Sequence, residues 1–179
     1  MFTAADKDRQ AQAAAALGVT TTEIERAALV DVGPVWFTIQ LRSAKAVTDL
    51  KPDMAAITAL SQDVAGLNVF GLYDSGAPTR IEVRSFAPAD GVPEDPVCGS
   101  GNGCVAALVR RDKVLDSNYY VASQGQCLRR DGRIMVRFAA DDIWIGGHAV
   151  TCIEGALGDH ALRKKEKSLG EAAKDVQNR

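Results

Sequence analysis

Short apolar runs alternate along the chain with alanine-rich segments, and the two patterns predict different elements. Runs rich in β-branched and aromatic residues, bounded by glycine, proline or polar clusters, are typical of strands. The first two such runs, residues 28–32 and 35–41, are separated by Gly33-Pro34. The same pattern predicts further strands at residues 67–73, 80–86, 119–123, 134–138, 143–145 and 149–153.

Helical patterns occupy the segments before and between these runs. The alanine-rich segment 4–17 predicts a helix that begins after Thr3 as N-cap and ends at Gly18. Residues 44–50 and 52–60 predict two more, and residues 22–26 leave room for a further turn. Pro52 suits a first helical turn. The Asp131-Gly132 pair predicts a hairpin turn that leads into the strand at 134–138.

The segment richest in candidate chemistry is a glycine-rich loop, E-D-P-V-C-G-S-G-N-G-C over residues 94–104, which leads into the small apolar run V-A-A-L-V. A helix that is apolar on every side is buried. The free N–H groups and positive dipole at its N-terminus favour an anion, and glycines allow close approach to the backbone. The spacing excludes a phosphate-binding loop, which needs a lysine after the glycines, and a G-x-S-x-G nucleophile elbow.

Cys98 lies just before this predicted helix, three residues after Asp95. The helix dipole favours a thiolate, so we expect the pKa of Cys98 to be lowered. Such a thiolate can act as a nucleophile or as a base toward a carbon acid. The alternative is a buried structural thiol, which is the role we expect for Cys104 within the helix.

Composition and charge limit the possible classes of protein. The chain has 179 residues, of which 46% are hydrophobic and 25% charged, as expected for one packed domain with or without a tail. The net charge of −2 argues against non-specific nucleic-acid binding. Apolar runs are far shorter than the ~20 residues of a membrane span, and the charged N-terminus does not resemble a signal peptide. We therefore expect a cytoplasmic protein without membrane or nucleic-acid partners.

The four cysteines form no C-x-x-C pair, and only His148 and His160 could join them as metal ligands. Reduced thiols are therefore expected, rather than a disulfide framework or a metal site.

After residue 157 the composition changes. A charged run, R-K-K-E-K, occupies residues 163–167, and the apolar residues Leu162, Leu169 and Val176 recur every seven positions. We divide the chain into a domain at 1–157 and a charged tail at 158–179, predicted as a solvated helix, with a basic binding patch as the alternative.

The E-D-P-V-C-G-S motif at residues 94–100 resembles the E-D-P-x-x-G-S motif of the phenazine biosynthesis (PhzF-like) family, which is similar to diaminopimelate epimerase and proline racemase. Other matching segments follow in the expected order up to about residue 155: D-V-G-P-V-W at 31–36, L-K-P-D at 50–53, R-S-F-A-P at 84–88, Q-G at 124–125 and I-G-G-H-A at 145–149.

The resemblance implies an α+β fold in which a curved mixed β-sheet wraps round a central helix, here residues 100–109. This chain would represent one half of a diaminopimelate epimerase-like two-half fold. The resemblance also implies the reaction of the family, which is proton transfer at carbon by an isomerase or epimerase without metal or other cofactor. By motif match, Asp95 contacts the substrate, while Gly99 and Ser100, and Gly101 beside them, hold its carboxylate. A cysteine at the position of Cys98 is one of two opposed bases in the epimerase and racemase branches.

The chain resembles only the second half of a family member. The first half would carry an N-x-x-E-[S/T] motif with the acid/base glutamate and a G-H-P motif, and neither occurs here. A second chain is therefore expected to complete the site, as a homodimer with two Cys98 residues opposed or as a complementary half-subunit. The functional alternatives are a cofactor-independent isomerase of a small carboxylate-bearing metabolite, a non-catalytic anion-binding or scaffold half-domain, and one subunit of a split isomerase.

Overall fold

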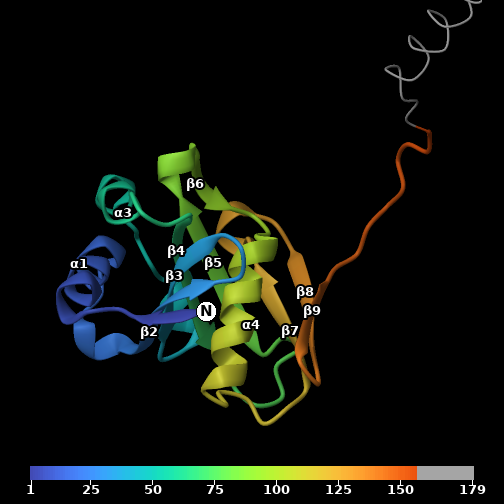
Figure 1. Cartoon of the computed structure of the whole chain (residues 1–179), viewed down its shortest axis with the longest axis horizontal. Helices are drawn as coiled ribbons and strands as arrows, with labels where there is room; N and C mark the ends of the chain where they lie inside the picture. Colours follow the sequence, from blue (N-terminus) through green and yellow to red (C-terminus); the bar gives the residue numbers. More distant parts are fainter. Residues whose placement is uncertain (157–179) are drawn as a thin grey trace, which may run out of the picture. The chain divides into compact units, whose positions relative to one another are not determined.

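A computed structural model describes residues 1–156, and within them Met1–His148 form one compact unit (Figure 1). The tail predicted at 158–179 lies outside the described residues. The unit is built on nine strands in one mixed sheet: β1 (Phe2–Ala4), β2 (Ile24–Asp31), β3 (Val35–Leu41), β4 (Gly66–Leu72), β5 (Ile81–Ala87), β6 (Val92–Asp95), β7 (Tyr119–Gln124), β8 (Gly132–Ala139) and β9 (Asp142–Gly146). The helices are α1 (Lys7–Leu17), α2 (Ala44–Thr48), α3 (Met54–Leu60) and α4 (Gly99–Arg111), with 3₁₀ turns η1 (Thr21–Glu23), η2 (Pro88–Asp90) and η3 (Gln126–Leu128).

The strands follow the order β1-β2-β3-β4-β5-β7-β8-β9, and β6 pairs with β5 outside this path. Most neighbours are antiparallel, but β3 pairs with β4 and β5 with β7 in parallel. The parallel pairs need crossover connections, which α2 and α3 supply in the first case and α4 in the second. Helices therefore lie on both faces of the sheet.

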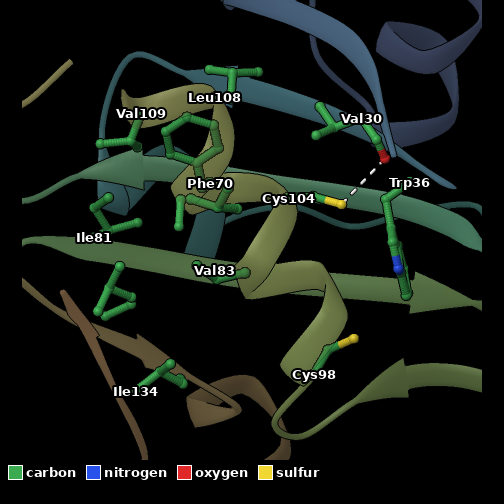
Figure 2. Close-up of a cluster of buried hydrophobic side chains, with 14 of the residues drawn as sticks. Val30, Trp36, Phe70, Ile81, Val83, Cys98, Cys104, Leu108, Val109 and Ile134 are labelled. Atoms are coloured by element: carbon green, nitrogen blue, oxygen red, sulfur yellow. Dashed lines mark hydrogen bonds between the residues drawn. The ribbon is translucent and has the colours of Figure 1, made fainter. Parts of the chain in front are cut away.

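Two hydrophobic clusters separate these faces. One lies between the sheet and α4, and the other contains residues of α1, α2 and α3. Side chains alternate between them along each strand: Trp36 packs toward α4, whereas its neighbour Phe37 packs toward the other helices. Figure 2 shows α4 against the sheet, with the Cys104 thiol donating to the carbonyl of Val30 at 3.3 Å. This is the expected curved mixed sheet around a central helix.

Several local expectations are wrong. Residues 2–4 form β1, which pairs with β2, so the first helix begins at Lys7 with Asp6 as its N-cap. The third helix uses Asp53 as N-cap, which leaves Pro52 before it. Gly132 already belongs to β8, and η3 occupies part of the connection from β7 in place of a tight Asp131-Gly132 turn. Residues 149–153 form no strand. Within residues 1–156, no helix is long and apolar enough to cross a membrane.

Candidate active site at the N-terminus of α4

The glycine-rich loop begins at the end of β6, where strand pairing with β5 places Asp95 opposite Ser85. Asp95 Oδ1 accepts from the N–H of Val97 at 2.9 Å, which turns the chain into the helix. Cys98 is the N-cap of α4, and its Sγ accepts from the N–H of Gly101 at 3.3 Å. A thiol thus occupies the capping position that serine or aspartate usually fills.

The environment of Cys98 raises the pKa of its thiol, contrary to the expected lowering. Burial is the main cause because the residue is only 5% exposed, and the negative charge of Asp95 acts in the same direction. Hydrogen bonds from Gly101 and Ser100 lower the pKa, but they do not outweigh the loss of solvent. At neutral pH Cys98 is therefore a neutral thiol, able to donate a proton. The sequence predicts the helix start and leaves a buried structural thiol open as the alternative, but it does not show that burial outweighs the helix dipole.

Ser100 links the thiol to the sheet. Its Oγ lies 3.7 Å from Cys98 Sγ and accepts from Trp36 Nε1 at 3.1 Å. Trp36 is buried on β3, and Figure 2 shows it on the sheet facing α4. The sequence pattern indicates no functional role for Trp36, although a buried indole N–H requires a hydrogen-bond partner.

The backbone donors of the first helical turn are not equivalent. Gly101 commits its N–H to the thiol, and its carbonyl accepts from Asn68 Nδ2 at 2.7 Å. Within residues 1–156, the N–H groups of Gly99 and Ser100 have no hydrogen-bond partner. Of the three residues expected to hold a carboxylate, Gly99 and Ser100 therefore offer open donors.

Gly101 contributes through its lack of a side chain. A Cβ at this position would lie 2.9 Å from Ser85 Oγ and 3.1 Å from Cys98 Sγ, closer than normal contacts. At Gly99, by contrast, a Cβ would meet nothing within 4 Å. Gly101 therefore lets the thiol and the strand below it approach the helix.

A buried polar network supports the loop from the sheet. Ser85 Oγ donates to Asn68 Oδ1 at 2.7 Å, and Gln124 joins Ser85 to Asn102 of α4. The sequence motifs do not predict these contacts. The signal in the sequence is the presence of polar residues inside otherwise apolar strands, since buried polar groups need partners.

Other candidate features lie elsewhere. Within the described part of the chain, no group of three or more His, Cys, Asp or Glu side chains could hold a metal ion. A cavity of about 440 Å³ lies beside α2, lined by residues such as Glu23, Lys45 and Lys51, and none of its lining residues belongs to the glycine-rich loop or to the polar network beneath it. Cys127 and Cys152 are exposed and lie outside the α4 cluster.

A curved mixed sheet around one buried helix, with a glycine-rich loop at the N-terminus of that helix, defines a half-domain of the diaminopimelate epimerase-like fold. The family model described as "Phenazine biosynthesis-like protein" matches residues 1–155. The chain therefore belongs to the phenazine biosynthesis-like (PhzF) family.

Curated relatives and solved structures agree with this assignment. The chain is 34% identical over 151 residues to "Antisense-enhancing sequence 1" of Schizosaccharomyces pombe, covering 78% of this chain and 50% of the relative. It is also 34% identical over 137 residues to an uncharacterized isomerase of the same yeast, and this match covers 70% of this chain and 73% of the relative. A crystal structure of a PhzF family protein from Enterococcus faecalis matches with a TM-score of 0.59 and 28% identity, over 76% of this chain and 46% of that one.

The relatives also differ from the chain in length. The chain covers 73% of the uncharacterized yeast isomerase, but it spans only about half or less of the length of other curated relatives. The crystal structure of a predicted epimerase from Pseudomonas aeruginosa shows the same fold, with a TM-score of 0.65 and 23% identity, over 83% of this chain and 52% of that one.

Proposed function

We propose that the chain forms one half of a cofactor-independent isomerase or epimerase that transfers protons at a carbon atom of a small carboxylate-bearing metabolite. The observation that carries this proposal is the arrangement at the start of α4. There a neutral thiol at Cys98 adjoins the open N–H groups of Gly99 and Ser100. The naming of several relatives as isomerases supports the reaction class.

Each group has a distinct role in this proposal. The N–H groups of Gly99 and Ser100 bind the substrate carboxylate, aided by the helix dipole. The carboxyl group of Asp95 contacts a polar substituent of the substrate. The Cys98 thiol gives its proton to the carbon next to the carboxylate, while a base on the opposite face removes the proton already there. The substrate gains one proton and loses one, so no oxidant or reductant is needed.

The opposite base is supplied by a second chain, either another copy or a complementary half. In a homodimer with two-fold symmetry, the second Cys98 would face the first. When one of the two thiols ionises to act as the base, the other keeps its proton and acts as the acid, because two adjacent thiolates repel. Exposed apolar side chains adjoin the loop: Val97 is 47% exposed, and Val32, whose Cγ2 would lie 3.7 Å from a Cβ added at Gly103, is 43% exposed. Such side chains are suited to burial by a partner.

Anion binding without turnover is the second candidate. It is favoured by one observation, the burial that keeps Cys98 protonated, because a thiol used only as a helix cap needs no ionised form. In that case the loop would bind a carboxylate but exchange no proton.

Deuterium exchange distinguishes the two. The protein is incubated in D₂O with a panel of 2-amino and 2-hydroxy acids, and loss of the α-proton is followed by NMR. We expect exchange with at least one compound and a loss of about 100-fold or more in Cys98→Ser, the range that a proton-transfer group contributes. Cys127→Ser is the matched control and keeps wild-type exchange. Exchange that survives in Cys98→Ser, or binding without exchange across the panel, would remove the isomerase proposal.

A further inference from the structure

Gln124, the last residue of β7, uses every hydrogen-bonding position of its side-chain amide beneath the loop. Its Oε1 accepts from the N–H of Cys98 at 3.2 Å and from Asn102 Nδ2 at 2.7 Å. Its Nε2 donates to the carbonyl of Asp95 at 2.9 Å and to Ser85 Oγ at 3.2 Å. Because the residue is 1% exposed, water does not compete for these bonds.

These contacts hold Cys98, to which we assign proton transfer, and Asp95, to which we assign substrate contact. Cys98 is fixed on both sides of its α-carbon, since Gln124 binds its N–H and Asn102 Nδ2 donates to its carbonyl at 2.8 Å. Asp95 is held through its carbonyl. One amide therefore joins the end of β6 to the first turn of α4.

The contact with Cys98 also selects which backbone donors remain open. The first turn of a helix leaves its N–H groups without intrahelical partners. Gln124 occupies the N–H of Cys98, and Cys98 Sγ occupies that of Gly101. The open pair at Gly99 and Ser100 is what remains.

The position of Gln124 is itself constrained by the neighbouring Gly125. Gly125 has a φ of +89°, and a Cβ there would lie only 2.5 Å from the carbonyl oxygen of Pro96. The end of β7 is thus pressed against the loop between Asp95 and Cys98. A shift of the amide away from the loop would separate the two segments.

We propose that Gln124 is a positioning residue that sets the direction of the Cys98 thiol and reserves the Gly99 and Ser100 N–H groups for a carboxylate ligand. It acts through Cys98 and Asp95 and does not touch the substrate. The ligand assignment rests on the function proposed above, whereas the effect on the thiol concerns this chain alone.

The test is the pH dependence of Cys98 alkylation by iodoacetamide, read for each cysteine by mass spectrometry of the digested protein. Gln124→Met removes all four hydrogen bonds with little change of volume. In the wild type, the hydrogen bond from the Gly101 N–H lowers the pKa of the Cys98 thiol. In the variant this bond loses its fixed geometry, so the pKa rises. We expect the midpoint for Cys98 to rise by about 0.5 pH units or more in the folded variant.

Gln126→Met is the matched control, because Gln126 is exposed and its Nε2 lies 3.4 Å from the hydroxyl of Tyr73, away from Cys98. Its midpoint should equal that of the wild type. A folded Gln124→Met protein, checked by circular dichroism and cooperative unfolding, with a wild-type midpoint would overturn the proposal. A purely structural Gln124 would lower the stability of the variant but leave that midpoint unchanged.

Gln124→Asn replaces the methionine variant if that variant does not fold. It keeps a buried amide on a shorter side chain, and the same rise of the Cys98 midpoint is expected.

The wild-type protein supplies a further test by ¹⁵N NMR with succinate as the probe. The amide signals of Gly99 and Ser100 should move, and that of Cys98 should stay. A Cys98 shift as large as that of Gly99 would show that its N–H is open to ligand and would contradict the proposal.

The alkylation test needs no turnover. If no compound exchanges its α-proton but the Gln124→Met midpoint rises, the positioning role stands and the isomerase proposal fails. If the wild type exchanges the α-proton but the Cys98 midpoint of Gln124→Met is unchanged, the isomerase proposal stands and the positioning role fails.

Discussion

At the scale of single residues, the properties of Cys98 depend on two opposing influences. The N-terminus of α4 and the Gly101 N–H favour the thiolate, while burial and Asp95 favour the neutral thiol, and the net effect raises the pKa. A helix dipole acts over its first turn and contributes ~0.3–1 kcal/mol at exposed sites, which the removal of solvent can exceed.

We therefore expect Cys98 to react with iodoacetamide with a midpoint above the value of about 8.5 for a free cysteine. Site-resolved labelling between pH 6 and 11 gives this value, with free cysteine in the same reaction as the reference and exposed Cys152 as a control for reagent access. Because the proposed dimer site needs one thiol as acid and one thiolate as base, α-proton exchange should rise as the pH approaches this midpoint and fall above it, where both thiols ionise. A midpoint below that of free cysteine would contradict the structural account.

Residue chemistry was predicted from sequence only in part. The motif identified Asp95, Cys98, Gly99, Ser100 and Gly101 as neighbours, and the structure brings them together at one helix start. It did not identify Trp36 or Gln124 as partners, because their contacts join residues 22 or more positions apart and depend on the sheet register. The direction of the Cys98 pKa was missed for the same reason, since burial is a property of the folded chain.

At the scale of elements, the strands were predicted best where apolar runs are long and bounded by turns. The core strands β3, β4 and β5 lie within one residue of their expected bounds. The short strands β1 and β6 were missed because each is held by its partner strand rather than by its own pattern. Residues 149–153 resemble a strand in composition but have no pairing partner within the described residues.

The junction of β5 and β6 depends on a buried ion pair on the sheet face opposite α4. Arg84 binds Glu94 through Nε and Nη2 at 2.9 and 2.8 Å, and both side chains are 7% exposed. Arg84 Nη1 also donates to the carbonyls of Val47 and Leu50 at 3.3 and 3.0 Å. The pair therefore connects the strand that leads to Asp95 with the end of α2.

Arg84→Ala should destabilise the protein by about 3–5 kcal/mol, because it leaves the buried Glu94 carboxylate without its partner. Urea unfolding measures the loss. Lys45→Ala is the control: it breaks the exposed pair with Asp49, whose side chains are 81% and 60% exposed, and should cost about 0.3–0.5 kcal/mol. Similar losses in the two variants would show that the Arg84 pair does not support the junction.

At the scale of the whole molecule, we propose that the chain forms one side of an active site. The residues of the α4 N-terminus come from this chain, whereas the family resemblance places the opposing base in a second half that the sequence does not contain. The chain covers 46% of the E. faecalis structure, as one half would. We propose a second copy of the chain as the complement, because the resemblance implies that the two halves of the family fold are similar to each other.

The most direct test of this account is the rate of α-proton exchange per chain as a function of protein concentration. We expect the rate per chain to rise with concentration and to level off where light scattering gives about twice the chain mass of 19.0 kDa. Cys98→Ser should assemble in the same way but show no such rise. A rate per chain that stays constant while the protein passes from monomer to dimer, or the absence of exchange in the fully assembled protein, would contradict the claim that two chains together form an isomerase site.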